Sequence, residues 1–361
     1  MSFEATKKEW SELYSFFRLL ADGFVYSGIP DLKNKSEEML PVAMIQRQEH
    51  DGTRCYSVEG SHIHITGENS DLRISRQRFG EMAAAILAAI KNSSDELVES
   101  PSGLEEFLDE AGICDLEAQT DDRTDFHIAF WDVNAPLTGF SVRSRLGSMN
   151  PLLDGGRTAN IKFEQSGIKF ASPTVNKVNM LESPNEVTDR ILMIERLGGV
   201  LKYADVADKV FKSNLSMIDL HFPRMLAEML RVMYLEGITR VSELTERIKI
   251  INPLKIKDEL ISKHGFYEYK MKRFLLALAL GMRPAKLYNG TDSAVAGFIF
   301  VDSNGEQLCY QKANEQLFGE FLFRNTRFEK GPLEKDKYGY LERENGVYYF
   351  KLNLKIGLLK R

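Results

Sequence analysis

The sequence predicts a mixed α/β fold, of the α+β kind, with a mixed β-sheet core flanked by helices. Two patterns lead to this prediction. Some segments carry apolar residues every three to four positions, as on one face of a helix, and others are β-type runs separated by turn residues. The β-type runs prevail towards both ends of the chain, and the middle is mainly helical.

The chain has 361 residues and a mass of 41.1 kDa, which is enough for two or three domains. No run approaches the roughly 18 apolar residues of a membrane-spanning helix, and the N-terminus lacks the apolar core of a signal peptide. Three cysteines, Cys55, Cys114 and Cys309, are too few and too far apart to predict a disulfide framework or a zinc cluster. We therefore expect a protein of the reducing cytoplasm, with no membrane partner.

The net charge of −5 is unusual for a protein that binds nucleic acid, but the charge is unevenly distributed. Residues 1–125 contain 12 Lys/Arg and 25 Asp/Glu, a net of −13, whereas residues 126–361 contain 35 and 27, a net of +8. This separation is compatible with a polyanionic partner, and ordinary solvated charged faces explain it equally well.

The first expected element is a helix from Glu4 to Asp22, because apolar residues recur at helical spacing and Gly23 follows. The next expected elements are strands within residues 40–74, a helix over Gly80–Lys91 and a short helix over Leu104–Ala111.

A β-hairpin is expected over Thr124–Gly147. Its first strand opens with Asp125, a turn that contains Pro136 follows, and the second strand carries Ser141 and Arg143. On facing strands, a carboxylate and a cation can meet at a phosphate group. The hairpin is therefore the first candidate for a catalytic centre.

The remaining chain predicts further elements in order. After a turn-rich loop, these are a strand over 159–164, helices over 187–197, 203–211, 222–234 and 271–280, strands over 295–301 and 307–310, a short helix over 315–321, and a strand pair around 344–346.

The chemistry that these residues favour is metal-dependent hydrolysis of a phosphodiester. No Walker loop, dinucleotide-binding glycine motif, zinc signature or nucleophile elbow is present. A divalent ion would activate water, and Mg²⁺ prefers one or two carboxylates. Asp125 can supply one carboxylate, and Glu12 or Glu9 from the first helix another. Ser141 and Arg143 are two apart and project from one face of their strand.

Asp132, His62 and His64 are less favoured candidates for metal ligands. Asp132 is a second candidate acid, but a regular strand turns it to the face opposite Asp125. His62 and His64 share a face of a strand, and no third ligand lies near them in sequence, so packing or solvent exposure explains them better.

At this hairpin and beyond it, the chain resembles the HpaII-type restriction endonucleases, a branch of the PD-(D/E)xK nucleases. The resemblance follows the same order over nearly the whole chain. Its pieces are Lys8-Glu9-Trp10-Ser11-Glu12-Leu13-Tyr14, Thr124-Asp125, Gly139-Phe140-Ser141-Val142-Arg143-Ser144-Arg145-Leu146-Gly147, Thr158-Ala159-Asn160-Ile161, Leu322-Phe323-Arg324-Asn325-Thr326-Arg327-Phe328-Glu329 and Lys351-Leu352-Asn353-Leu354.

The resemblance implies a PD-(D/E)xK-like core and a type II endonuclease that cuts double-stranded DNA at a short palindrome, with CCGG as the candidate site and Mg²⁺ as the cofactor. It implies that Asp125 binds the metal with support from Glu12 or Glu9. Ser141 falls where many related nucleases have a second acid, and Arg143 falls at their lysine position. Residues 1–170 would form the nuclease core, 171–290 a helical region, and 291–361 an α/β region for DNA recognition.

Three departures from the family pattern stand out. Arginine stays protonated at any working pH, so Arg143 can stabilise phosphate charge but is a poor general base. Asp154 and the segment Gly331–Lys337 also differ from the family pattern, so the target sequence can differ from CCGG.

DNA recognition is expected to combine phosphate contacts with base-edge contacts, in which arginine reads guanine and asparagine reads adenine. The candidates are Arg145, Arg157, Asn160, Arg324, Asn325 and Arg327. A palindromic site favours a twofold homodimer, although some enzymes with small sites act as monomers. A cognate DNA methyltransferase is expected in the same system.

Two other functions fit the same residues. The first is a sequence-specific DNA-binding protein on an inactive nuclease scaffold, because Arg143 replaces the lysine. The second is an α/β enzyme that does not act on nucleic acid and whose basic surface is incidental.

Overall fold

The structure, a computed structural model, describes residues 3–32, 36–68, 70–120, 122–131, 136–291 and 293–359. The chain forms two compact units. The first comprises residues 1–150 and 292–321, and the second comprises residues 151–291 and 322–359. The chain therefore passes between the units three times, the last time within helix α11 (Glu315–Asn325).

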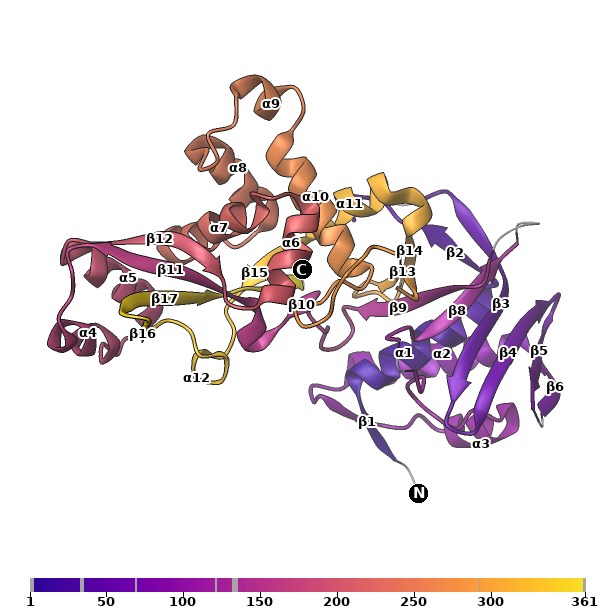
Figure 1. The fold of residues 1–361 in the computed structure, drawn as a ribbon. Coiled ribbons are helices and arrows are strands. Elements are labelled where there is room, and N and C mark those ends of the chain that lie inside the picture. The colour runs from indigo at the N-terminus through magenta and orange to yellow at the C-terminus, as the bar shows by residue number, and fades with distance from the viewer. Residues whose placement is uncertain are drawn as a thin grey trace. The chain divides into compact units, whose positions relative to one another are not determined.

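A mixed nine-stranded sheet forms the framework of the first unit, in the order β2-β14-β13-β9-β8-β3-β4-β5-β6 (Figure 1). Its strands are β2 (Phe24–Ser27), β3 (Met39–Glu49), β4 (Gly52–Glu59), β5 (His62–Gly67), β6 (Ser70–Ser75), β8 (Phe126–Phe130), β9 (Thr138–Ser144), β13 (Val295–Val301) and β14 (Gln307–Gln311). β9 pairs antiparallel with β8 and parallel with β13, so the hairpin lies inside the sheet and not at its edge. β2 pairs with both β14 and β3, which closes six of the strands into a ring.

Three helices pack on this sheet: α1 (Lys7–Asp22), α2 (Arg76–Asn92) and α3 (Leu104–Ala111). Their apolar faces join the inward residues of the strands in one core. At its centre, the rings of Phe17, Phe79 and Phe107 meet edge to face at centroid distances of 5.0–5.4 Å. A short pair of strands, β1 (Glu4–Thr6) and β7 (Leu97–Glu99), runs beside them. The first helix is therefore fixed on the sheet along its buried face.

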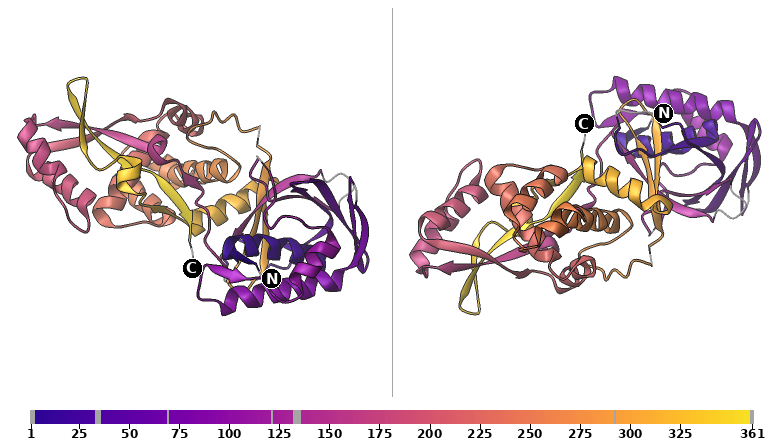
Figure 2. Two further views of the ribbon diagram at one scale, coloured as in Figure 1. Left: turned by 90° about the horizontal axis from the view of Figure 1, so that it is seen from below. Right: turned by 90° about the horizontal axis from the view of Figure 1, so that it is seen from above.

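The second unit is built from two small sheets and a group of helices. The sheet β12-β11-β17-β16 places β17 against β11, although nearly 200 residues separate them in the chain (Figure 2). The other sheet has the order β10-β18-β15. The elements are β10 (Leu153–Asp154), β11 (Asn160–Gly167), α4 (Ser172–Asn179), α5 (Glu186–Arg196), β12 (Gly199–Val206), α6 (Lys209–Ile218), α7 (Phe222–Glu236), α8 (Val241–Ile251), α9 (Asp258–Ser262), α10 (Phe266–Ala279), β15 (Thr326–Glu329), α12 (Leu333–Asp336), β16 (Leu341–Glu344), β17 (Val347–Asn353) and β18 (Lys355–Leu358), with short 3₁₀ turns at Gly156–Ala159 and, in the first unit, at Lys312–Asn314.

The predicted mixed α/β fold is confirmed. The predicted helix over 203–211 is wrong, because residues 199–206 form strand β12 and α6 begins only at Lys209. Val200 and Lys202 are exposed while Leu201 between them is buried, and pairing with β11 stabilises this alternation. The division into two units also differs from the expected boundaries at 170 and 290, since β11 lies in the second unit and β13 in the first. None of the described helices is long and apolar enough to span a membrane.

Candidate active site

The hairpin brings Asp125 next to the second strand of the pair. Phe126 lies opposite Phe140 in the β8–β9 register, and Asp125 directly precedes β8. The backbone N–H of Asp125 donates to the carbonyl oxygen of Phe140 over 2.8 Å, and the N–H of Val142 donates to Oδ2 of Asp125. Both hydrogen bonds fix the carboxylate at the start of β8.

Helix α1 places two charged side chains, Lys8 and Glu12, near Asp125. Thr6 caps the helix: its hydroxyl accepts from the N–H of Glu9, and the Glu9 carboxylate accepts from the N–H of Thr6 over 2.7 Å. The Glu9 carboxylate is therefore engaged in the capping box at the N-terminus of α1. Lys8 and Glu12 are four residues apart and lie on one side of the helix.

Glu12 is buried and is held by the segment that precedes the hairpin. Glu12 is only 6% exposed, and its Oε1 accepts a hydrogen bond from the N–H of Ala118 over 2.8 Å. Burial, with the nearby charge of Asp125, raises the pKa of Glu12 to about 8, against the lowering effect of that hydrogen bond. The two carboxylates are therefore close enough to resist being ionised together.

Asp125 lies between carboxylates and cations. Burial raises the pKa of Asp125 to about 6, while the Val142 hydrogen bond and the charges of Arg143 and Lys8 oppose the rise. Lys8 forms an ion pair with Glu117. Burial alone would lower the pKa of Lys8, but Glu117, together with the charges of Glu12 and Asp125, raises it, so Lys8 stays protonated.

The second strand supplies a hydroxyl and a guanidinium. The Oγ atom of Ser141 is buried and has no hydrogen-bond partner among the described residues. The Cζ atom of Arg143 lies 4.9 Å from the ring centroid of Phe298 on β13, which stacks the guanidinium in a defined position. Burial lowers the pKa of Arg143 from its ordinary value, and the charge of Asp125 opposes this. Arg143 remains the cation on the strand side of Asp125.

The donor set of this cluster suits Mg²⁺. Asp125 and Glu12 each use one oxygen in a backbone hydrogen bond, which leaves the other oxygen as a candidate ligand. Among the described residues, no group of three or more His, Cys, Asp or Glu side chains is arranged to hold a metal. Mg²⁺ does not need three protein ligands, because it keeps waters and takes phosphate oxygens. The two carboxylates and the Ser141 hydroxyl are hard oxygen donors of the kind that it prefers.

The other expected metal ligands lie elsewhere. Asp132 is outside the described residues. The imidazole of His64 contacts Asp71 at 2.8 Å and Glu59 at 3.3 Å, on an exposed part of the sheet. His62 is exposed, and its ring contacts the hydroxyl of Ser61 at 3.0 Å.

Sequence reasoning missed two members of the cluster. Lys8 lies four residues before Glu12, and this spacing on a helix was the available signal that they share a face. Glu117 stands in an acidic stretch in which no spacing singles it out, so only the fold identifies it as the partner of Lys8.

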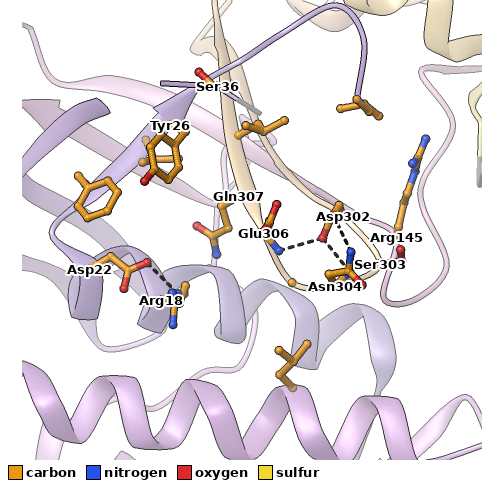
Figure 3. A pocket seen from close by; sticks show the side chains of 16 residues that line it. Arg18, Asp22, Tyr26, Ser36, Arg145, Asp302, Ser303, Asn304, Glu306 and Gln307 are labelled. Carbon is orange, nitrogen blue, oxygen red and sulfur yellow. Dashed lines mark hydrogen bonds and ion pairs between the residues drawn. The ribbon is translucent and has the colours of Figure 1, made fainter. Parts of the chain in front are cut away.

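Arg145 stacks on β13 two residues further along than Arg143 does. Its Cζ lies 5.1 Å from the ring of Phe300, and its side chain lines a cavity of about 610 Å³ in the first unit (Figure 3). An ion pair between Arg18 and Asp22, at 2.7 Å, lines the same cavity.

The other predicted DNA contacts lie in the second unit. Asn160 is 2% exposed, and its amide donates to the carbonyl oxygen of Asp336 over 2.8 Å and accepts from the Asn353 amide over 2.9 Å. Its side chain therefore joins the ends of α12 and β17 inside the unit. Arg157 is exposed, and its Nε donates to the carbonyl oxygen of Lys335 over 3.1 Å.

Three further candidates stand where α11 meets β15. Arg324 is exposed, and Asn325 is partly buried at the end of the helix. Arg327 pairs with Glu329 at 3.0 Å. These residues lie on one continuous segment of the second unit.

The two units carry opposite charges. Residues 1–150 and 292–321 contain 15 Lys/Arg and 31 Asp/Glu, a net of −16. Residues 151–291 and 322–359 contain 30 and 21, a net of +9. A polyanion is therefore attracted to the second unit and repelled by most of the first.

Comparison with known proteins identifies the family of the chain. The family model described as HpaII restriction endonuclease matches residues 6–358. The chain is 32% identical over 362 residues to the type II restriction enzyme HpaII of Haemophilus parainfluenzae, and the match covers 99% of each chain. No solved structure matches the chain.

Proposed function

The chain belongs to the HpaII restriction endonuclease family, and from this premise we propose that it hydrolyses both strands of DNA at a short palindromic site with the help of Mg²⁺. The observation that carries the proposal is the meeting of Glu12 and Asp125 in one buried place, with Lys8 and Arg143 on either side. Two carboxylates flanked by two cations suit a divalent ion and a phosphodiester.

The metal would be held by Asp125 and Glu12, with Ser141 beside them. When bound, Mg²⁺ supplies positive charge to the scissile phosphate and lowers the pKa of water. The Val142 N–H orients Asp125, and the Ala118 N–H orients Glu12. The protein thus prepares two oxygen donors that need no rearrangement.

The two cations have separate tasks in this proposal. Arg143 is stacked on Phe298, so its guanidinium can hold a non-bridging phosphate oxygen but cannot accept a proton. Lys8 is half-exposed and paired with Glu117, and it can turn to the phosphate on the helix side. Both stabilise charge that grows in the transition state.

DNA would be held mainly by the second unit, because that unit has a net charge of +9 in its 151–291 and 322–359 residues. Arg157 and the segment Arg324–Arg327 are the proposed contacts. We propose CCGG as the first site to test. Asp154, in β10, pairs with Lys355 at 2.8 Å, and the segment Gly331–Lys337 packs by α12 on the turn that holds Arg157, so both departures from the family lie beside a proposed contact.

A palindromic site is read by two copies related by a twofold axis, so a homodimer is proposed on DNA. A cognate methyltransferase that modifies the same site is proposed to protect the host DNA.

The test is digestion of plasmid DNA by the purified protein, with Mg²⁺ and with EDTA, followed by sequencing of the ends. Discrete fragments with one end sequence, formed only with Mg²⁺, are expected. Random nicking would contradict the proposal of a specific site. Cleavage in EDTA would contradict the metal requirement.

The alternative is a specific DNA-binding protein that does not cut, and Arg143 in place of a lysine favours it. Binding to one sequence without cleavage in Mg²⁺ or Mn²⁺ would establish that alternative.

A further inference from the structure

Arg47 and Glu49 form a fully buried ion pair that has no part in the chemistry described above. Arg47 and Glu49 stand two apart on β3, so their side chains project from one face of the strand. Both side chains are completely buried, and Nη1 of Arg47 pairs with Oε1 of Glu49. Replacing such a pair with apolar residues is often neutral or stabilising, so its presence calls for another explanation than stability.

The other hydrogen bonds of the two side chains go to one short segment. Oε2 of Glu49 accepts from the N–H groups of Cys114 over 3.1 Å and of Asp115 over 2.8 Å. Nη2 of Arg47 donates to the carbonyl oxygen of Leu116 over 2.8 Å. Three consecutive backbone groups outside any helix or strand are thus held by two side chains of the sheet.

The same segment holds the active-site groups of α1. Directly after Leu116, Glu117 pairs with Lys8, and the N–H of Ala118 donates to Glu12 over 2.8 Å. Arg47 also contacts α1 itself, because its Cζ lies 5.5 Å from the ring centroid of Phe16, one helical turn after Glu12. A shift of residues 114–118 would therefore displace both the Ala118 N–H that donates to Glu12 and the Glu117 carboxylate that pairs with Lys8.

We propose that Arg47 and Glu49 are positioning residues for the active site, which hold residues 114–118 so that Ala118 orients the Glu12 carboxylate and Glu117 orients Lys8. The role in catalysis rests on the proposed nuclease function, whereas the role in holding the segment stands on the geometry alone. Groups that orient metal ligands in this way change metal affinity or activity by roughly 10–100-fold when they are removed.

The test uses the double variant Arg47→Met with Glu49→Leu. Apolar side chains of similar size fill the buried space without leaving one charge alone, so the variant is expected to fold with nearly unchanged thermal stability. A matched control is Arg78→Met with Glu110→Leu. That pair, at 2.9 Å, belongs to the same unit, and Arg78 stacks on Phe107 at 5.4 Å. The described hydrogen bonds and ion pairs of Arg78 and Glu110 include none to residues 114–118.

The first measurement is amide hydrogen exchange of the full-length protein without DNA or metal. Peptides that cover residues 114–118 are expected to exchange at least about 10-fold faster in the Arg47/Glu49 variant, while peptides of β8 and β9 exchange as in the wild type. Unchanged exchange of residues 114–118 would overturn the proposal, whether or not the protein cuts DNA.

The second measurement is the single-turnover cleavage rate as a function of Mg²⁺ concentration. The variant is expected to cut roughly 10–100-fold more slowly or to need as much more Mg²⁺, with unchanged affinity for DNA in Ca²⁺, whereas the control cuts like the wild type. Wild-type rates and metal dependence in the variant would overturn the catalytic part. If the wild type does not cleave, the proposed function fails, and the exchange measurement still decides the structural part.

A second variant tests the hydrogen bond from Ala118 to Glu12 separately from the Arg47–Glu49 pair. Ala118→Pro removes the N–H that reaches Glu12, restricts the backbone at residues 117 and 118, and leaves the Arg47–Glu49 pair in place. It is expected to lower cleavage like the double variant while Cys114 and Asp115 stay protected from exchange. Full cleavage by this variant would show that Ala118 does not orient Glu12.

Discussion

The N–H of Val142 donates a hydrogen bond to the carboxylate of Asp125, so the acid of one hairpin strand is held by the strand that carries Ser141 and Arg143. The two strands therefore form one functional part. A change on either of them acts on the same few atoms.

Asp125→Ala is expected to reduce DNA cleavage by at least about 10²-fold, because the loss of a carboxylate proposed to bind the metal would remove several kcal/mol of transition-state stabilisation. The measurement is single-turnover digestion of a plasmid with Mg²⁺. The control is Asp71→Ala, an exposed acid on β6 whose side chain has His64 as its hydrogen-bond and ion-pair partner among the described residues. Digestion by Asp125→Ala at the wild-type rate would remove Asp125 from the site.

Arg143→Lys is expected to keep or raise cleavage, since lysine retains the positive charge, whereas Arg143→Ala is expected to lose about 10²-fold in rate. Arg143 also packs on Phe298, so the thermal stability of both variants is measured alongside. Equal rates for the alanine variant and the wild type would show that Arg143 does not contact the phosphate.

Glu12→Gln is expected to change how stability depends on pH in the metal-free protein. Burial and Asp125 raise the pKa of Glu12 from 4.5 to about 8, so between these values the folded protein holds a proton that the unfolded chain releases. The stabilisation from Glu12 is therefore full below pH 4.5 and is lost as the pH rises through about 8. From pH 5 to pH 9, the variant should gain stability relative to the wild type, at about 1.4 kcal/mol per unit of pKa shift. Urea unfolding at each pH measures the difference, and parallel stability curves would contradict it.

Arg157→Gln is expected to weaken DNA binding, measured by fluorescence anisotropy in Ca²⁺ over a range of salt concentrations. If Arg157 contacts a phosphate, affinity falls for every sequence and the salt slope decreases by about 1. If it reads a base, only the cognate site loses about 1–3 kcal/mol. Unchanged binding to both cognate and unrelated DNA would exclude Arg157 from the interface.

Gly297→Ala is expected to destabilise the first unit by about 1–3 kcal/mol, because a Cβ there would lie 2.1 Å from the carbonyl oxygen of Tyr310 and 2.8 Å from Cε1 of Phe140. Gly80→Ala is the matched control, and it is expected to increase stability. Its new Cβ would meet only the Cβ of Ala21 at 3.5 Å, and alanine favours helix α2 by about 1 kcal/mol. Thermal unfolding compares the two, and a stable Gly297→Ala would show that β13 and β14 can separate there.

Local patterns were sufficient to predict most of the elements. The short helix over Leu104–Ala111 has the predicted bounds, and the strands of residues 40–74 and the hairpin were predicted because turns interrupt β-type runs. The helix predicted over 203–211 failed because β12 depends on pairing with β11, a contact that no local spacing reveals.

The candidate site shows the same limit. Asp125, Ser141 and Arg143 lie on two adjacent strands, so a hairpin pattern was sufficient to group them. Glu12 comes from more than 100 residues away, and the resemblance to a family, together with helical spacing, suggested it. Nothing local identifies Arg47 and Glu49, because their role arises from a buried contact with residues 114–118.

The division of the first unit between residues 1–150 and 292–321 also sets the order in which the protein can assemble on the ribosome. β9 has no neighbour on one side until β13 is made, and the whole of 151–291 is translated between them. At 5–20 residues per second this interval lasts roughly 7–28 s, and during it Arg143 lacks the ring of Phe298. Strand β9 thus lacks its neighbour β13 until most of the second unit has been synthesised.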